Sequence, residues 1–315
     1  MATTVAPGTR GTVELALRGR RVDVRGRVFQ AALLLTLLLA LAFLVVLLWT
    51  TWTTAFPVFR ERGLSFVTSN LSALASRAGV RQGVVGSLFL IAFVAVIAIP
   101  LGVAASIYLQ EYARDTRLNR LLITNIRNLA GVPSIVFGIL GLVVFARALR
   151  SITGPAVSGL SLITGGLTLS VLVMPIVILV TMEALRAVPM SIREAAYGVG
   201  ATRWEVVRSH VLPYAAPGIF TGTILSLARA FGETAPLLMV GAVTGYLTPA
   251  RGQSLGEILR GTRYTALPTE IFSFSRQIGS EWRANAAAAI IVLLVIILAV
   301  NAVAIVLRNR YERRW

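Results

Sequence analysis

The sequence predicts an all-α polytopic membrane protein with six transmembrane helices. Of its 315 residues, 56% are hydrophobic and 14% are charged, against about 45–50% and about 25% in soluble globular domains. The mean hydropathy is +0.79. The 30 basic and 13 acidic side chains give a net charge of +17, and they lie in short stretches between long apolar runs. A basic excess also occurs in nucleic-acid-binding proteins, but this alternation favours a chain that crosses a bilayer several times and binds no nucleic acid.

Six apolar segments reach, or nearly reach, the roughly 20 residues that a helix needs to cross a bilayer. They are residues 28–49, 83–109, 128–146, 159–182, 214–240 and 286–307. The first and last are uninterrupted apolar runs, which suit contact with lipid. The middle four carry Gly, Pro, Ser and Thr throughout, which suits helices packed against one another or broken helices that line a pathway. A cleaved signal peptide is disfavoured because the first run far exceeds the 7–15 residues or so of a signal core.

Arginine counts predict the orientation, because cytoplasmic loops carry an excess of basic residues. With the N-terminus inside, the inside segments hold 18 Arg over 84 residues and the outside segments hold 11 over 90. Both termini, residues 1–27 and 308–315, are therefore predicted to be cytoplasmic tails, and the polar stretch 1–15 to be disordered.

Two of the predicted external segments are long, residues 50–82 and 241–285. The second contains an amphipathic stretch, 268–282, with the aromatic residues Phe272, Phe274 and Trp282. This stretch is interpreted either as an interfacial helix with its aromatic rings at the headgroup level or as a docking rim for an external partner.

The composition excludes several kinds of site. All 30 basic residues are Arg, so the phosphate-binding G-x-x-x-x-G-K-[ST] loop is missing. The chain has no Cys and a single His, His210, which leaves no zinc site of the usual ligands and no cysteine nucleophile. Its two Asp, Asp23 and Asp115, lie in polar flanks, which makes a Ser-His-Asp triad improbable. We therefore expect no catalytic residues, no metal and no cofactor in this chain.

Residues 193–213, between the fourth and fifth segments, predict a helix-turn-helix on the cytoplasmic face. Their opening Glu-Ala-Ala favours helix, Gly198 and Gly200 favour a turn, and a second short helix must stop at or before Pro213. Five apolar side chains of this loop would be exposed unless something covers them. They are Ala195, Ala196, Val199, Trp204 and Val207.

Arg229 and Glu233 lie inside the fifth segment, four residues apart, so a continuous helix would place them on one face. Arg229 would lie roughly 18–22 Å along the helix, within a hydrocarbon layer of about 30 Å. An Arg at such depth costs about 2.5–3.5 kcal/mol on insertion scales and needs a partner. Glu233 is that partner, either in a structural ion pair or in an anion site on a translocation path.

An anion site with this pair would favour protonated phosphate. Guanidinium presents a planar fork that matches oxyanions. The Glu233 carboxylate would repel sulfate, but it would accept a hydrogen bond from the P–OH of phosphate. The neighbouring small residues Gly218, Gly222, Ser226 and Ala230 repeat every four positions and predict close helix packing.

The loop resembles the coupling loop of ABC importer permeases. The shared pattern is E-A-A-x-x-x-G, nine residues, one further position, x, and L-P. The matching residues are Glu194, Ala195, Ala196, Gly200, Leu212 and Pro213, whereas His210 stands where that family has a branched aliphatic residue. The resemblance implies that the loop enters a cleft on a separate ATPase subunit and transmits its closing motion.

Two further runs, ARAFGETAPLL (228–238) and VPSIVFGILG (132–141), resemble phosphate-specific ABC permeases of the PstA type. The resemblance implies a MetI-like permease domain over 83–307, preceded by a first helix and external loop over 28–82, in the cell membrane. It implies three kinds of protein partner besides lipid and inorganic phosphate: a PstC-type permease, an ABC ATPase dimer and an extracytoplasmic phosphate-binding protein. It further implies a substrate role for Arg229 and Glu233, to which Ser134 and Thr234 would add donors.

Three other functions remain open from the sequence. One is a permease for another oxyanion, such as sulfate, molybdate or phosphonate. Another is an ion-coupled transporter or channel that needs no ATP, against which the coupling-loop pattern argues. The third is a membrane anchor or sensor in phosphate signalling that moves nothing.

Overall fold

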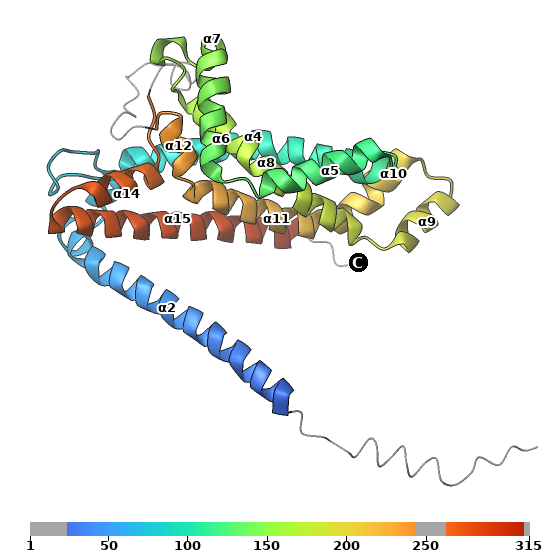
Figure 1. Ribbon diagram of the computed structural model, residues 1–315, viewed down its shortest axis with the longest axis horizontal. Coiled ribbons are helices and arrows are strands. Elements are labelled where there is room, and N and C mark those ends of the chain that lie inside the picture. The colour runs from blue at the N-terminus through green and yellow to red at the C-terminus, as the bar shows by residue number, and fades with distance from the viewer. Residues whose placement is uncertain (1–23, 243–262, 312–315) are drawn as a thin grey trace, which may run out of the picture. The chain divides into compact units, whose positions relative to one another are not determined.

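The computed structural model describes residues 24–242 and 263–311 (Figure 1). Residues 1–15, predicted to be disordered, and residues 312–315 of the predicted C-terminal tail lie outside the described residues. Contacts divide the chain into two units, Met1–Thr50 and Thr51–Trp315. The described part of the first unit is the beginning of helix α2 (Val24–Arg62), and every residue from 24 to 50 is exposed. An apolar helix exposed all round suits contact with lipid or with another subunit.

All regular elements within residues 24–242 and 263–311 are helical, which confirms the predicted fold class. The second unit continues after α2 with α3 (Ser65–Thr68), α4 (Arg81–Ile107), the π-helical turn η1 (Tyr108–Tyr112), α5 (Arg117–Ala130), α6 (Ser134–Leu140) and the π-helical η2 (Gly141–Ala148). It goes on with α7 (Arg150–Thr153), the 3₁₀ turn η3 (Pro155–Val157), α8 (Leu162–Arg186), α9 (Met190–Gly198), α10 (Arg203–Val206) and the π-helical turn η4 (Val207–Val211). It ends with α11 (Leu212–Gly232), α12 (Ala235–Met239), α14 (Leu267–Arg276) and α15 (Ser280–Tyr311).

Five helical stretches of the described chain are long and apolar enough to cross a membrane, and a bent pair adds a sixth if it is counted as one span. The five are Val24–Arg62, Arg81–Tyr112, Leu162–Arg186, Arg203–Gly232 and Ser280–Arg310. The bent pair is α5 followed by α6–η2, with an angle of 105° between its halves. The bend falls inside the predicted third span at 128–146, which is therefore not one continuous helix. Pro133 explains it, because a proline lacks an N–H and disfavours helical geometry in the residue before it.

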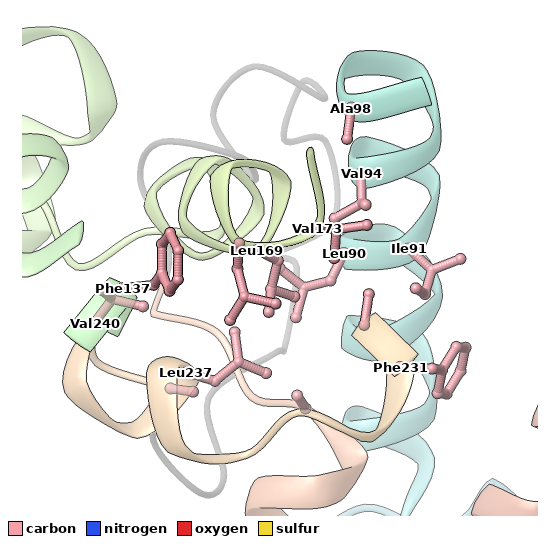
Figure 2. Packing of buried hydrophobic residues seen from close by; sticks show 14 of the residues in the cluster. Leu90, Ile91, Val94, Ala98, Phe137, Leu169, Val173, Phe231, Leu237 and Val240 are labelled. Atoms are coloured by element: carbon pink, nitrogen blue, oxygen red, sulfur yellow. The ribbon is translucent and has the colours of Figure 1, made fainter. Parts of the chain in front are cut away.

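The core of the second unit lies between α4 and α8, with α11 packed against both (Figure 2). Small residues let these helices approach closely. A side chain at Gly222 of α11 would overlap Val180 of α8, and one at Gly102 of α4 would lie 2.7 Å from a methyl carbon of Val177. Ser226 and Ala230 are also buried, so the predicted packing role of the small-residue stripe is confirmed.

Helix α14 lies at the opposite end of the second unit from α9 and α10 (Figure 1). Of its predicted interfacial aromatic residues, Phe272 is exposed, but Phe274 is buried and packs on Trp282 with ring centroids 5.4 Å apart. The prediction of three rings at the headgroup level is therefore wrong for Phe274, which closes a core formed with α2 and α15.

Glu270 of α14 is a buried carboxyl group that the sequence did not reveal. Its side chain lies over Gly83 at the start of α4 and has no exposed surface. Among the described residues neither carboxylate oxygen has a hydrogen-bond partner at full bonding geometry. Burial raises the pKa of Glu270 to about 8, against the opposing effect of the nearby Gly83 backbone and Thr265 hydroxyl. Glu270 is therefore mostly protonated at neutral pH.

We expect Glu270→Gln to remove a pH-dependent part of the stability. The folded-state pKa of about 8 lies above the ordinary glutamate value of 4.5, so this contribution is complete below pH 4.5 and is lost as the pH rises to about 8. Glutamine is neutral throughout and has the same shape. The free energy of unfolding, measured by thermal unfolding of the purified protein, should therefore fall less steeply between pH 5 and 9 in Glu270→Gln than in wild type. The difference should amount to a few kcal/mol in total. Exposed Glu281 provides the control: Glu281→Gln should retain the wild-type slope, and equal slopes in all three proteins would contradict the expectation.

Candidate functional site

Arg229 lies in the last turn of α11, and the helix ends at Gly232. Glu233 caps it with an extended backbone, φ −74° and ψ 121°. The prediction of one continuous helix through both residues is therefore wrong. Pro236 explains the break, because in a continuous helix its ring would clash with the carbonyl of Gly232 four residues earlier.

The predicted pair nevertheless forms across this break. Nε of Arg229 lies 3.5 Å from Oε1 of Glu233, and the two side chains are 53% and 15% exposed. A single long contact through Nε is a weak ion pair. Neither terminal nitrogen of Arg229 donates a hydrogen bond to any described residue. The guanidinium is half exposed, and its two terminal nitrogens can hold an anion in their fork.

The break is held in place by the core. Phe231 and Leu237 stand on either side of Glu233 and Thr234, and both are buried against α4 and α8 (Figure 2). Because these two anchors fix the chain at both ends, the intervening turn has little freedom. The structure thus presents Glu233 from a rigid support.

Ser134 is the first residue of α6 and Thr234 directly precedes α12, and these two short helices pack together. A side chain on Gly138 of α6 would lie 2.7 Å from Cα of Pro236, so the two backbones are in close contact. Within the described chain, no hydrogen bond or ion pair connects Ser134 or Thr234 to Arg229 or Glu233. Arg229, Glu233 and Thr234 thus lie close in sequence at the break between α11 and α12, whereas Ser134 lies on α6, which packs against α12.

The loop predicted at 193–213 consists of α9, a turn, α10 and η4. Gly200 makes the turn with φ +87°, a conformation that favours glycine. Thr202 caps α10 in a capping box with Glu205. The prediction that the second helix stops at or before Pro213 is wrong, since residues 203–232 form one helical stretch. The wider π-helical turn η4 precedes the proline and changes the backbone pairing there.

The loop exposes part of the apolar surface that its sequence predicted. Val199 is 86% exposed and Trp204 is 58% exposed, and Glu194 and Ala195 are exposed as well. Ala196 and Val207 are buried instead, so the prediction that both would be exposed is wrong. Ala196 packs in a small core with residues of α8 and α11, and therefore supports the loop rather than forming its contact surface.

His210 is exposed, whereas its neighbours Val207 and Val211 are buried. These two valines supply the aliphatic packing under the loop. The second helix is therefore packed although His210 replaces the branched aliphatic residue of the family pattern. Among the described residues no group of three or more metal-ligating side chains comes together.

The comparison with protein families covers the loop and the pair. Residues 98–315 match the family described as binding-protein-dependent transport system inner membrane component. The match includes more than half of the chain. The chain belongs to this family. It is accordingly a multi-pass membrane permease subunit of a transport system.

Curated relatives of this permease include two phosphate transport proteins. Phosphate transport system permease protein PstA of Yersinia pestis is 32% identical over 72% of this chain and 71% of its own length. Phosphate transport system permease protein PstC of Mesorhizobium japonicum is 30% identical over 80% of both chains. The permease is thus similar to both types of subunit.

A solved structure shows the same fold. It is a bacterial alginate ABC transporter in complex with an alginate-bound periplasmic protein, with a TM-score of 0.61. The alignment covers 92% of the permease and 96% of that chain at 15% identity. The likeness confirms the predicted ABC permease fold.

Proposed function

We propose that this permease is the membrane-spanning subunit of an ATP-driven importer of inorganic phosphate and forms half of the translocation path. The observation that carries this proposal is Arg229, an exposed cation at a break in a spanning helix. Its weak contact with Glu233 leaves the guanidinium fork available to an anion. The names of the PstA and PstC relatives support phosphate as that anion.

The pair fits phosphate by its chemistry. The two terminal nitrogens of Arg229 would hold two phosphate oxygens. Glu233 would accept a hydrogen bond from the P–OH group of monobasic or dibasic phosphate, whereas fully ionised sulfate has no proton to donate and would be repelled. An unpaired acceptor facing an anion is costly, which is how such a site discriminates against near-isosteres. The hydroxyls of Ser134 and Thr234 would add donors to the anion.

A permease that forms half of the translocation path requires a second permease subunit to form the other half. Because the chain is similar to both PstA and PstC proteins, a related permease of PstC type is the partner we propose for it. An ABC ATPase dimer would bind the exposed loop surface around Glu194, Ala195 and Gly200. The buried Ala196 would hold this surface in place by packing against α8 and α11. An extracytoplasmic phosphate-binding protein would deliver the anion, and lipid would surround the apolar outer helices.

In this arrangement residues 83–307 form the permease domain and both termini are cytoplasmic, so the 193–213 loop faces the ATPase. Closure of the ATPase would open the cavity outward, and hydrolysis would open its cytoplasmic side. The permease itself would carry no nucleotide, since it has no lysine for a nucleotide-binding loop. Alternating access then consists of rocking around the fixed Arg229 site.

We expect labelled-phosphate uptake by phosphate-starved cells to require this chain and ATP, and to be unaffected by excess sulfate. The measurement compares cells with and without the chain, with ATP depletion and with competing sulfate, molybdate or phosphonate. Uptake that survives ATP depletion but collapses with the proton gradient would identify an ion-coupled transporter instead. Glu233→Gln tests the selectivity for phosphate over sulfate. The glutamine amide can donate a hydrogen bond to sulfate, so sulfate should compete with phosphate uptake at least about tenfold better in this variant. Equal competition in wild type and variant would contradict the role of Glu233.

A further inference from the structure

Arg193, one residue before Glu194, is largely removed from solvent. Its side chain is only 12% exposed, and its guanidinium makes three contacts. One terminal nitrogen donates to the backbone oxygen of Val188 at 2.7 Å. The other donates to the backbone oxygen of Leu185 at 2.9 Å and to Oε1 of Glu111 at 2.9 Å. A single side chain thus satisfies two carbonyls at the end of α8 and a carboxylate.

The acceptor Glu111 belongs to a different element, the π-helical turn η1 that ends α4. Its side chain is 10% exposed, so both members of this ion pair are largely removed from water. Removing one member of such a pair leaves the other charged and buried, which is strongly unfavourable. The pair therefore joins α9 to the ends of α4 and α8 as one rigid assembly.

The other half of the loop has a separate attachment. The helical stretch Arg203–Gly232 runs without interruption from α10 to the turn of α11 that carries Arg229. Between the two halves lies Gly200, with open space around it and φ +87°. A force on α9 can thus reach the ends of α4 and α8 through the polar contacts of Arg193, in addition to the apolar packing around Ala196. A force on α10 reaches the Arg229 site through the continuous helical stretch, and Arg203 of α10 also lies over the Tyr112 ring of η1 at 5.3 Å.

We propose that Arg193 and Glu111 are positioning residues that transmit the motion of the ATPase from α9 to α4 and α8. The inference rests on the proposed function, because it assumes that an ATPase drives the loop. Neither residue contacts the transported anion. Without the pair, only apolar packing would connect α9 to α4 and α8, so these helices would follow the ATPase incompletely and much of the hydrolysis would proceed without transport.

The test uses the full transporter, this chain with its partner permease, ATPases and binding protein, reconstituted in liposomes. The quantity measured is phosphate transported per ATP hydrolysed. Arg193→Ala and Glu111→Ala should each lower this ratio about tenfold, a magnitude usual for couplings between sites. The double variant should lower it no further than either single one. Arg193→Lys, which retains the charge but loses the fork, should restore part of the ratio.

Arg186 provides a matched control. It also lies at the end of α8 and also contacts η1, donating to Oε1 of Gln110 at 3.1 Å, but it is exposed. Arg186→Ala should leave the ratio within about twofold of wild type, as expected for an exposed contact. An unchanged ratio in Arg193→Ala would overturn the proposal. A wild-type transporter that carries no phosphate, or that carries it without ATP, would instead overturn the proposed function.

A distance measurement keeps the proposal testable where a variant transports nothing. The chain has no cysteine, so spin labels can be attached at Ser191→Cys on α9 and Tyr108→Cys on η1, both exposed positions. The label distance should stay narrow with and without nucleotide in the otherwise wild-type transporter, and should broaden in Arg193→Ala. A distance that is already broad with Arg193 present, or that stays narrow in Arg193→Ala, would refute a rigid connection.

Discussion

Replacing Arg229 with alanine should abolish phosphate uptake while the transporter still assembles. The substitution removes the guanidinium fork and leaves Glu233 as an uncompensated negative charge facing the anion. Two charge-assisted hydrogen bonds contribute about 1.5–3 kcal/mol each. Their loss alone lowers affinity by about a hundredfold or more. Because the Arg229 side chain is half exposed and its ion pair is long, its removal should have little effect on folding.

The measurement is labelled-phosphate uptake together with co-purification of the partner subunits. Arg229→Lys should retain a small part of the uptake, because an ammonium keeps the charge but lacks the planar fork. Arg308 supplies the control, since it contacts the same helix near its middle, donating to Thr221 at 2.9 Å. Arg308→Ala should transport normally. Wild-type uptake by Arg229→Ala would refute the anion site and would leave the pair as a structural contact.

Replacing Gly200 with proline should separate transport from ATP hydrolysis or release the ATPase altogether. Gly200 has φ +87°, whereas proline fixes φ near −65°. The substitution also removes the N–H that donates to the backbone oxygen of Tyr197 at 2.9 Å. The turn between α9 and α10 must therefore rearrange, although the spanning helices keep their contacts. Glu194→Arg should have a similar effect by reversing the charge of the exposed loop surface.

Co-purification of the ATPase and the transport-linked hydrolysis rate measure this effect. Gly198→Ala is the matched control, because Gly198 also has open space around it but lies within α9 without a positive φ. Alanine at this position should preserve coupling, and circular dichroism should show unchanged helix content in every variant. Normal co-purification together with normal transport in Gly200→Pro and Glu194→Arg would exclude the loop as the connection to an ATPase.

The positions at which the spanning helices break could not be predicted from the sequence. The sequence marked residues 128–146 and 214–240 as apolar, and both contain prolines. It did not tell which prolines end a helix, because a proline is tolerated in a first turn or after a wider turn. Pro133 and Pro236 accompany breaks, whereas Pro213 follows the π-helical turn η4 and lies inside a continuous stretch. Whether a proline ends a helix depends on whether neighbouring helices supply hydrogen-bond partners for the backbone groups that the proline leaves unpaired.

The sequence by itself determined the fold class, the number of membrane-crossing segments to within one bent pair, the coupling-loop pattern and the pairing of Arg229 with Glu233. These features depend on local properties: the length of apolar runs, the spacing of a motif, and the high cost of an arginine within an apolar span. Only the tertiary structure decided that Glu270 is buried over Gly83, that Ala196 supports the loop from within, and that Arg193 meets Glu111. Each of these contacts joins segments distant in the chain, and which of them meet depends on how whole helices pack.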